Sequence, residues 1–320
     1  MAKFKVVVTD HVFPSREVET RLLVEGLGAD VVFCPNAEET TLAQAVRDAD
    51  AVLVTYARIS GRVIDAMQKA RIIARYGVGV DNIDLEAAAR RGLWVTNVPD
   101  YCVEEVSDHA LALILALARK VVFLDRRVRQ GQWDYRDLTP IPRLAGKTLG
   151  LVGFGRIARA TGRKARAFGM RILAYDPYVK EVAEEEAQLV GLPELLAASD
   201  FVSIHVPLLA ETRHFIGANE LAMMKPTACI VNTSRGGIID EAALAEALRE
   251  GRLAGAALDV VEQEPIPLDH PLIGQPNCIL TPHVAFYSEE STIELQEKAC
   301  RQVVKALTGQ RPDYVIVGPK

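Results

Sequence analysis

The chain has few cysteines and no paired arrangement of them. Its 320 residues include five cysteines, which lie far apart, and no Cys-x-x-Cys pair occurs. This spacing predicts neither a disulfide framework nor a zinc site. We therefore expect no bound metal and a reducing compartment.

Concentrated positive charge and long apolar runs are also missing. The formal net charge is −5 and the basic residues are scattered, whereas nucleic-acid binding needs a concentrated basic face. The longest apolar stretch, residues 110–118, is about half as long as a membrane span requires. The first residues have a strand pattern and not the pattern of a secretory signal. We expect a cytoplasmic protein that binds neither nucleic acid directly nor membranes.

Strand-like and helix-like patterns alternate along the chain. Strands are expected at residues 5–9, 30–33, 51–56, 72–76, 94–97, 148–152, 170–175, 201–206, 229–232, 256–260 and 278–281, and the first five alternate with helices at 16–25, 40–47, 61–67 and 85–91. Such alternation is typical of parallel sheets covered by helices on both faces. The sequence therefore predicts an α/β fold with two doubly wound parallel-sheet domains.

The domains are expected to interrupt one another. A long helical pattern at residues 103–130 lies between the two units, and its apolar residues on all sides indicate burial against other protein. A helix at 289–307 and a strand at 313–317 follow the last strand of the second unit. We expect this terminus to return to the first unit, which gives one domain of residues 1–99 and 288–320 and a second of residues 100–287.

Residues 148–177 contain the parts of a dinucleotide-binding unit in order. A strand leads into Gly153 and Gly155, Ala158 takes the third position of the G-x-G-x-x-G/A pattern, and a helix over 156–168 follows. The missing Cβ atoms and the helix N-terminus are suited to a pyrophosphate. The next strand ends at Asp176, about 20 residues after the glycines, where a carboxylate can accept hydrogen bonds from ribose hydroxyls. Because that carboxylate repels a 2′-phosphate, we predict NAD as the cofactor.

Three later strands end in polar residues that a core does not require. Arg235, Glu264 and His283 follow the strands at 229–232, 256–260 and 278–281. Singly, each has an ordinary interpretation: a surface cation, a solvated acid and a satisfied core histidine. Together, at one sheet edge beside a dinucleotide, they supply the groups that hydride transfer to a carbonyl needs.

The chemistry assigns a role to each residue of this set. His283 can move a proton on or off the substrate oxygen near neutral pH. Glu264 can bind the other ring nitrogen and fix its tautomer. Arg235 can hold a substrate carboxylate and polarise the adjacent carbonyl. Asp259 is a candidate for positioning the nicotinamide carboxamide or for supporting His283.

These motifs, in this order and spacing, resemble the D-isomer-specific 2-hydroxyacid dehydrogenase family over essentially the whole chain. The resemblance implies a Rossmann NAD domain, residues 100–287, and a flavodoxin-like substrate-binding domain, residues 1–99 and 288–320. It implies Arg235, Glu264 and His283 as catalytic residues, with Glu264 chosen over Glu262 because the family's glutamate directly precedes a proline. The implied cofactor-binding residues are Gly153, Gly155, Arg156, Ile157, Asp176, Thr233, Ser234 and Asp259.

The segment from Arg75 to Asn82, Arg-Tyr-Gly-Val-Gly-Val-Asp-Asn, resembles the family's substrate loop. The resemblance implies that Arg75, Val78 and Gly79 bind the substrate, with backbone N–H groups receiving its carboxylate. A plain glycine turn after a strand is the other interpretation. The implied partners are a small 2-keto or 2-hydroxy acid and a second copy of the chain in a homodimer.

Arg75 and the run from His283 to Glu290 are similar to the C-terminal-binding-protein branch, whose animal members are NAD(H)-responsive transcriptional corepressors. The chain departs from that branch at Phe286, where the branch has tryptophan, and at Val78 and Val106, where it has small hydroxyl residues. Our first hypothesis is an NAD-dependent oxidoreductase that interconverts a D-2-hydroxy acid and its 2-keto acid. The alternative is an NAD(H)-sensing regulatory protein, corepressor-like, on the same fold.

Overall fold

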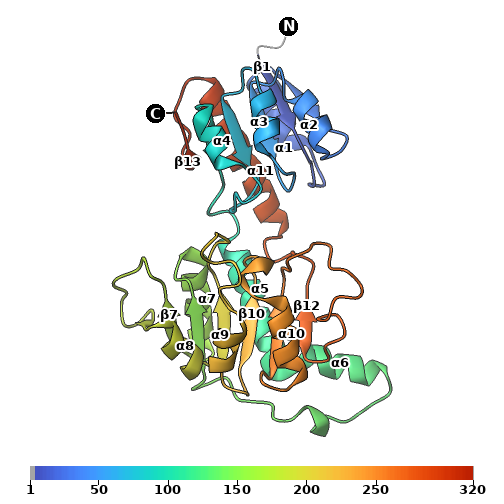
Figure 1. Cartoon of the computed structure of the whole chain (residues 1–320), viewed down its shortest axis with the longest axis vertical. Coiled ribbons are helices and arrows are strands. Elements are labelled where there is room, and N and C mark those ends of the chain that lie inside the picture. The colour runs from blue at the N-terminus through green and yellow to red at the C-terminus, as the bar shows by residue number, and fades with distance from the viewer. Residues whose placement is uncertain (1–3, 320) are drawn as a thin grey trace. The chain divides into compact units, whose positions relative to one another are not determined.

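A computed structural model describes residues 4–319 and separates the chain into two compact units (Figure 1). The first unit comprises Met1–Cys102 and Tyr287–Lys320, and the second comprises Val103–Phe286. Each unit contains a predominantly parallel sheet with helices on both faces, so the predicted fold class is confirmed.

The sheet of the first unit has six strands in the order β13-β5-β4-β3-β1-β2. Its strands are β1 (Phe4–Val8), β2 (Ala29–Phe33), β3 (Ala51–Val54), β4 (Ile72–Arg75), β5 (Trp94–Thr96) and β13 (Val315–Val317). The five parallel strands follow the flavodoxin-like order 2-1-3-4-5. The edge strand β13 runs antiparallel to β5, and this single pairing departs from the all-parallel sheet that was predicted, as edge strands of such folds often do.

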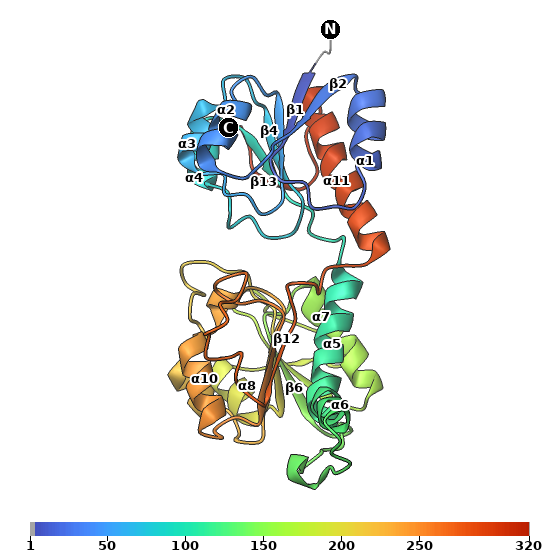
Figure 2. The same cartoon turned by 90° about the vertical axis from the view of Figure 1, so that its right-hand side faces the viewer.

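Two helical layers cover this sheet (Figure 2). The π-helical turn η1 (Thr20–Glu25), α1 (Glu17–Glu19) and α11 (Glu289–Leu307) lie on one face, and α2 (Glu39–Ala45), α3 (Gly61–Ala66) and α4 (Leu85–Arg90) lie on the other. The strands between them are buried on both sides, with Val7, Val52 and Ile73 fully inaccessible. This burial explains their continuous apolar runs.

The sheet of the second unit has seven strands in the order β12-β11-β10-β9-β6-β7-β8. They are β6 (Thr148–Val152), β7 (Arg171–Tyr175), β8 (Gln188–Leu189), β9 (Phe201–Ile204), β10 (Cys229–Asn232), β11 (Gly255–Leu258) and β12 (Cys278–Leu280). Counted from β6, this is the Rossmann order 3-2-1-4-5-6 with one further strand. All of its pairings are parallel, so the strand ends that carry polar residues share one edge.

The helices of the second unit also form two layers (Figure 2). The helices α5 (Val103–Arg119) and α7 (Arg156–Ala167) pack on one face, and α8 (Leu192–Ala198), α9 (Ala218–Met223) and α10 (Glu241–Arg249) pack on the other. The prediction of a single helix over residues 103–130 is wrong, because α5 ends at Arg119 and α6 (Val121–Arg129) begins after Lys120. The break is a left-handed backbone conformation at Lys120, with φ of 58°.

No helix in the described part of the chain is long and apolar enough to cross a lipid bilayer. All five cysteines are free thiols, and four of them are buried.

Candidate active site

The strand β6 leads into a tight glycine turn at the N-terminus of α7. Gly153 has a φ of +89°, and a Cβ there would lie 2.7 Å from the carbonyl oxygen of His205, so a side chain is excluded. A Cβ on Gly155 would meet no atom within 4 Å. The backbone at Gly155 therefore borders open space directly before the first turn of a twelve-residue helix, which is the environment that a phosphate group needs.

Asp176 lies beside this glycine turn at the end of β7. Its Oδ2 accepts a hydrogen bond of 2.9 Å from the N–H of Phe154, and its Oδ1 accepts one of 2.9 Å from the N–H of Tyr178. These bonds hold the carboxylate next to the turn. Arg156 and Ile157 occupy the first turn of α7, where Arg156 is exposed and Ile157 is half-buried.

The segment after β10 also fits a nucleotide cofactor. The side chain of Asn232 accepts from the N–H of Ser234 and donates to the carbonyl of Arg235, which fixes the turn. The Ser234 hydroxyl donates to the carbonyl of Ile204. The Thr233 hydroxyl is buried and has no hydrogen-bond partner within residues 4–319. A buried hydroxyl without a partner is unfavourable by itself, and a polar cofactor group would satisfy it.

His283 and Glu264 form a direct pair. Nδ1 of His283 lies 2.7 Å from Oε2 of Glu264, and Oε1 of the same carboxylate accepts a 3.2 Å hydrogen bond from the N–H of Val261. Both side chains are partly exposed, at 25% for His283 and 37% for Glu264. The carboxylate contacts Nδ1, so proton exchange with a substrate would involve the other ring nitrogen, Nε2.

The backbone of His283 has the left-handed conformation, with φ of 54°. Its N–H donates to the carbonyl of Asp259 at 2.7 Å, and its ring meets the ring of Phe286 edge to face. A left-handed non-glycine residue is uncommon and is retained where surrounding contacts define it. Here it turns the chain so that the imidazole reaches Glu264.

Asp259 is fully buried and organises the segment that carries His283. Its Oδ1 accepts from the Thr281 hydroxyl at 2.6 Å and from the N–H of Val284 at 3.0 Å, and its Oδ2 accepts from the N–H of Ala285 at 2.9 Å. With three donors from one loop, this carboxylate fixes the position of the loop after β12. Its contacts therefore favour the supporting role over direct contact with a cofactor.

Arg235 follows the turn at the end of β10 in extended backbone conformation and is half-buried. Its Nη1 donates to the carbonyl of Ser234 at 2.8 Å. A Cβ on the next residue, Gly236, would lie 1.9 Å from the carbonyl carbon of Val261. Only glycine permits this contact, which packs the loop of Arg235 directly against the loop that ends in Glu264.

The neighbouring acid on that loop has another partner. Glu262 contacts Nε2 of His214 and not His283. The structure thus pairs His283 with Glu264, the acid that the sequence motif selects.

Arg75, Val78 and Gly79 belong to the first unit. Arg75 is buried at the end of β4, and a Cβ on Gly77 would lie 1.1 Å from its Nη1, so glycine is required for the guanidinium to fold over the turn. The carbonyl of Val78 accepts from the Asn97 side chain at 2.7 Å. Within residues 4–319, no backbone acceptor contacts the N–H groups of Val78 or Gly79.

Two histidines of the second unit were not predicted from the sequence. His109 on α5 reaches the Thr281 hydroxyl at 3.1 Å and lies 3.5 Å from Oδ1 of Asp259. His205 follows β9 beside Gly153, and burial lowers its pKa to about 4. His205 stands at a strand end like His283, which could have identified it, whereas His109 lies inside a helix and offers no such signal.

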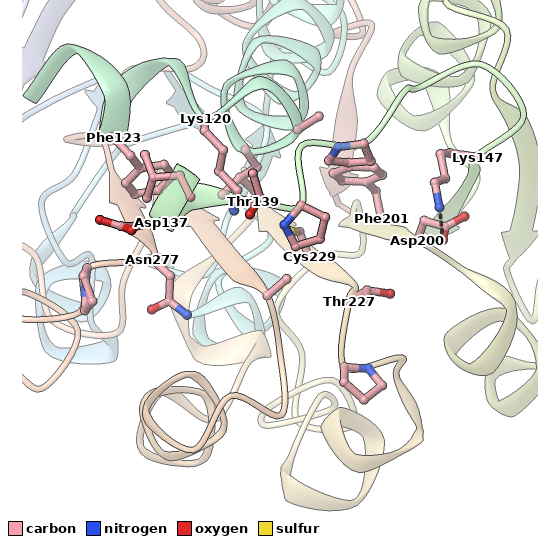
Figure 3. A pocket seen from close by; sticks show the side chains of 18 residues that line it. Lys120, Phe123, Asp137, Thr139, Lys147, Asp200, Phe201, Thr227, Cys229 and Asn277 are labelled. Atoms are coloured by element: carbon pink, nitrogen blue, oxygen red, sulfur yellow. Dashed lines mark hydrogen bonds and ion pairs between the residues drawn. The ribbon is translucent and has the colours of Figure 1, made fainter. Parts of the chain in front are cut away.

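A separate cavity of about 450 Å³ lies at the amino ends of the strands of the same sheet (Figure 3). Lys147 and Asp200, which precede β6 and β9, form a 3.3 Å ion pair at its wall, and Cys229 begins β10. These residues mark the amino ends of the strands, whereas His283, Glu264 and Arg235 follow the carboxyl ends. In this fold class ligands bind at the carboxyl ends. Among the described residues, no group of three His, Cys, Asp or Glu side chains could hold a metal ion.

Comparison with known proteins gives the same picture. The sequence profile of the NAD binding domain of the D-isomer specific 2-hydroxyacid dehydrogenases matches residues 111–285. A glyoxylate reductase of Korarchaeum cryptofilum is 45% identical over 280 residues, covering 85% of this chain and 84% of the relative.

Solved structures agree over nearly the full length. A protein from Thermus thermophilus has a TM-score of 0.89 and 38% identity, with 98% of this chain and 100% of that chain covered. The D-lactate dehydrogenase of Aquifex aeolicus, complexed with NAD and lactic acid, has a TM-score of 0.88 and 28% identity, with 98% and 100% covered. The dinucleotide turn, the acid–histidine pair and these likenesses together lead to one conclusion. The chain belongs to the D-isomer specific 2-hydroxyacid dehydrogenase family.

Proposed function

We propose that the protein reduces a small 2-keto acid to the D-2-hydroxy acid, with His283 as the proton donor, Glu264 as its orienting carboxylate and Arg235 as the clamp for the substrate carboxylate. The reaction class, NAD-dependent interconversion of 2-hydroxy and 2-keto acids, is that of the family. The observation that carries the residue assignment is the 2.7 Å contact between His283 and Glu264 at the sheet edge that also holds the glycine turn.

The proton path follows from this contact. Because Nδ1 of His283 binds Glu264, the ring is held in one orientation, and Nε2 is proposed as the nitrogen that exchanges the proton. The negative carboxylate favours the charged ring that donates to the carbonyl oxygen during reduction. In the reverse direction the neutral ring accepts the proton from the hydroxyl. Arg235 stabilises negative charge on the substrate carboxylate and the developing alkoxide.

The same geometry supports a proposal for the cofactor residues. NADH, when bound, supplies the hydride. Gly153, Gly155, Arg156 and Ile157 would hold its pyrophosphate at the start of α7, and Asp176 its adenosine ribose. Thr233 and Ser234 would hold the nicotinamide half, supported by the buried Thr233 hydroxyl. Asp259, also expected among these residues, is proposed to act through the loop of His283, because its carboxylate is committed to that loop.

The substrate is proposed to be a small 2-keto acid such as glyoxylate, which is the substrate named for the Korarchaeum relative. The backbone N–H groups of Val78 and Gly79, without backbone acceptors of their own in the described chain, support the expectation that this turn receives a carboxylate, with Arg75 beneath it. We also propose a homodimer and a cytoplasmic location, the latter because all five cysteines are free thiols.

The NAD(H)-sensing alternative gains no support from these observations. A protein that only senses the cofactor does not require a proton-transfer group, whereas His283 and Glu264 are held together by contacts of their own. The similarity to the corepressor branch stays a prediction, since the Korarchaeum, Thermus and Aquifex relatives do not distinguish the branches.

The test is NADH consumption with glyoxylate, hydroxypyruvate, pyruvate and phenylpyruvate. Arg235→Ala should lower kcat/KM by at least about 10²-fold, because an anchoring and charge-stabilising donor is lost. Arg249→Ala, at an exposed arginine of α10, is the matched control and should keep the wild-type rate. Asp176→Ala should narrow the preference for NADH over NADPH. Measurable NADH binding with no turnover on any acid would contradict the proposal and favour the sensor.

A further inference from the structure

A second histidine–glutamate pair lies behind the proposed catalytic loop. Glu241 is the first residue of α10, and only 7% of it is exposed. Its Oε1 accepts a 2.7 Å hydrogen bond from the backbone N–H of Glu262, and its Oε2 lies 3.0 Å from Nε2 of His270. Glu241, at the start of α10, is thereby hydrogen-bonded to the loop that ends in Glu264.

The orientation of His270 can be assigned from its own partners. Its Nδ1 accepts a 3.3 Å hydrogen bond from the N–H of Leu272. A ring nitrogen that accepts carries no proton, so the proton is on Nε2 and is donated to Glu241. His270 therefore fixes the direction of the Glu241 carboxylate.

The loop is consequently held at successive backbone positions. The N–H of Val261 binds Oε1 of Glu264, the N–H of Glu262 binds Glu241, and Gly236 packs against the peptide between them. The other oxygen of Glu264 contacts His283. A continuous series of contacts thus runs from His270 through Glu241 and the loop to His283.

Capping of α10 does not account for Glu241. Asp240 already caps the helix, with its side chain accepting from the N–H of Ala243. An acid can complement the helix dipole from an exposed position, without the cost of burying a carboxylate. Glu241 is instead buried, and that burial raises its pKa. A buried carboxylate is unfavourable unless its contacts compensate, and here those contacts lead to the loop.

We propose that Glu241, oriented by His270, is a positioning residue for catalysis: it holds the loop at Glu262 so that Glu264 meets Nδ1 of His283. The inference rests on the proposed function, because it gives Glu241 a role only if His283 transfers the proton. Glu241 acts through Glu264 and touches neither the cofactor nor the reacting atoms.

Several charged and titratable groups in the described chain lie along this path. Glu241 lies against His270 and near the loop residue Glu262, whose own partner is His214. Burial and the charge of Glu241 both raise the pKa of Cys278 in β12. His283 faces Glu264, and Asp259 with His109 lies behind its backbone. Among these groups, Glu264 both belongs to the loop that Glu241 holds and contacts His283, so we expect Glu241 to act on the pH dependence through Glu264.

The test compares Glu241→Ala, Glu241→Gln and His270→Ala with the control Glu246→Ala, an exposed acid of the same helix. In Glu241→Ala, kcat/KM for glyoxylate should fall about tenfold, because a small displacement of a catalytic group is costly. The alkaline limb of the pH–rate profile for reduction should move to lower pH, since Glu264 would stabilise the imidazolium less well. The Kd for NADH should stay within about twofold, because the pyrophosphate turn is untouched.

Glu241→Gln should recover most of the rate that Glu241→Ala loses, because the amide oxygen can still accept from the N–H of Glu262. His270→Ala should also move the alkaline limb of the pH–rate profile to lower pH, but by less than Glu241→Ala does. A wild-type rate and limb in Glu241→Ala would overturn the inference. Equal losses in both Glu241 variants together with weakened NADH binding would also overturn it, since they would indicate a structural role. If His283→Ala keeps full activity, the proposed function itself fails, and that result is separate from either outcome.

Discussion

Two glutamates on one short loop have different partners, and the difference is set by the backbone. Glu262 contacts His214, whereas Glu264 contacts His283 at 2.7 Å. Both acids are partly exposed, so burial does not separate their roles. The adjacent N–H groups of Val261 and Glu262 bind different acceptors, Glu264 of the same loop and Glu241 of α10, and these bonds hold the backbone that carries the two acids.

This difference gives a matched pair of substitutions. Glu264→Gln should lower kcat for 2-keto acid reduction by about 10²–10⁴-fold, because the neutral amide neither stabilises the imidazolium nor fixes its tautomer. Glu262→Gln, the same change two residues away, should leave kcat within about threefold, because its partner His214 has no proposed part in proton transfer. Steady-state rates at saturating NADH measure both. Equal losses in the two variants would show that the loop, and not the Glu264 carboxylate, matters.

At the level of elements, the strand ends were predictable and the helix break was not. Apolar runs and terminal polar residues located the strands that position Gly153, Arg235 and His283. Nothing in the sequence marks the break at Lys120, because neither glycine nor proline stands there and a lysine seldom adopts the left-handed conformation that the backbone has at this residue. The contact between Glu241 and His270 was also unpredictable, since residues 29 positions apart meet only through the fold.

The histidine at the end of β9 should make the stability of the protein depend on pH. Burial lowers the pKa of His205 from 6.5 to about 4, so the unfolded chain binds this proton at a higher pH than the folded chain does. Stability should therefore be lost as pH falls from 6.5 towards about 4.

His205→Gln should remove this loss, because an amide does not titrate there and can still bond to the Ser203 hydroxyl, the partner of His205. Between about pH 7 and about pH 4, the unfolding free energy of the variant should fall by about 1–3 kcal/mol less than that of the wild type. Urea titrations at several pH values measure it, with His214→Gln as the control for an exposed imidazole. Parallel pH dependences of wild type and His205→Gln would show that burial of His205 does not disfavour its charge.

The whole molecule divides into two units, and the strand ends that carry the proposed catalytic residues all fall in the second of them. The Rossmann order of the second sheet could be anticipated from the motif at Gly153 and Gly155, because that motif occurs at the first strand of such a sheet. The antiparallel direction of β13 could not be anticipated, because a short apolar run does not reveal the direction of a strand. The strand β8 could not be anticipated either, because it has only two residues.

The second unit is a continuous segment, which allows a test at this scale. A fragment of residues 103–286 should bind NADH with a Kd within about tenfold of that of the full chain, since such a unit has its own core and carries the proposed pyrophosphate and ribose groups. It should not reduce 2-keto acids, because Arg75, Val78 and Gly79 are absent. Fluorescence titration and an NADH oxidation assay measure the two properties. Turnover by the folded fragment would show that the turn of residues 75–79 is not needed for substrate binding.

The discontinuity of the first unit has a consequence for the order in which the protein acquires its structure during translation. One face of the sheet of β1 to β5 is covered by α1, η1 and α11, and the residues of α11 are made after the entire second unit. Until α11 appears, a nascent chain emerging from the ribosome therefore contains an early sheet with one apolar face that only α1 and η1 cover. The second unit, whose strands and helices are contiguous in sequence, can be finished first. The unit whose strands are synthesised first is thus completed after the second unit, and that interval is when it is most exposed to aggregation and to chaperones.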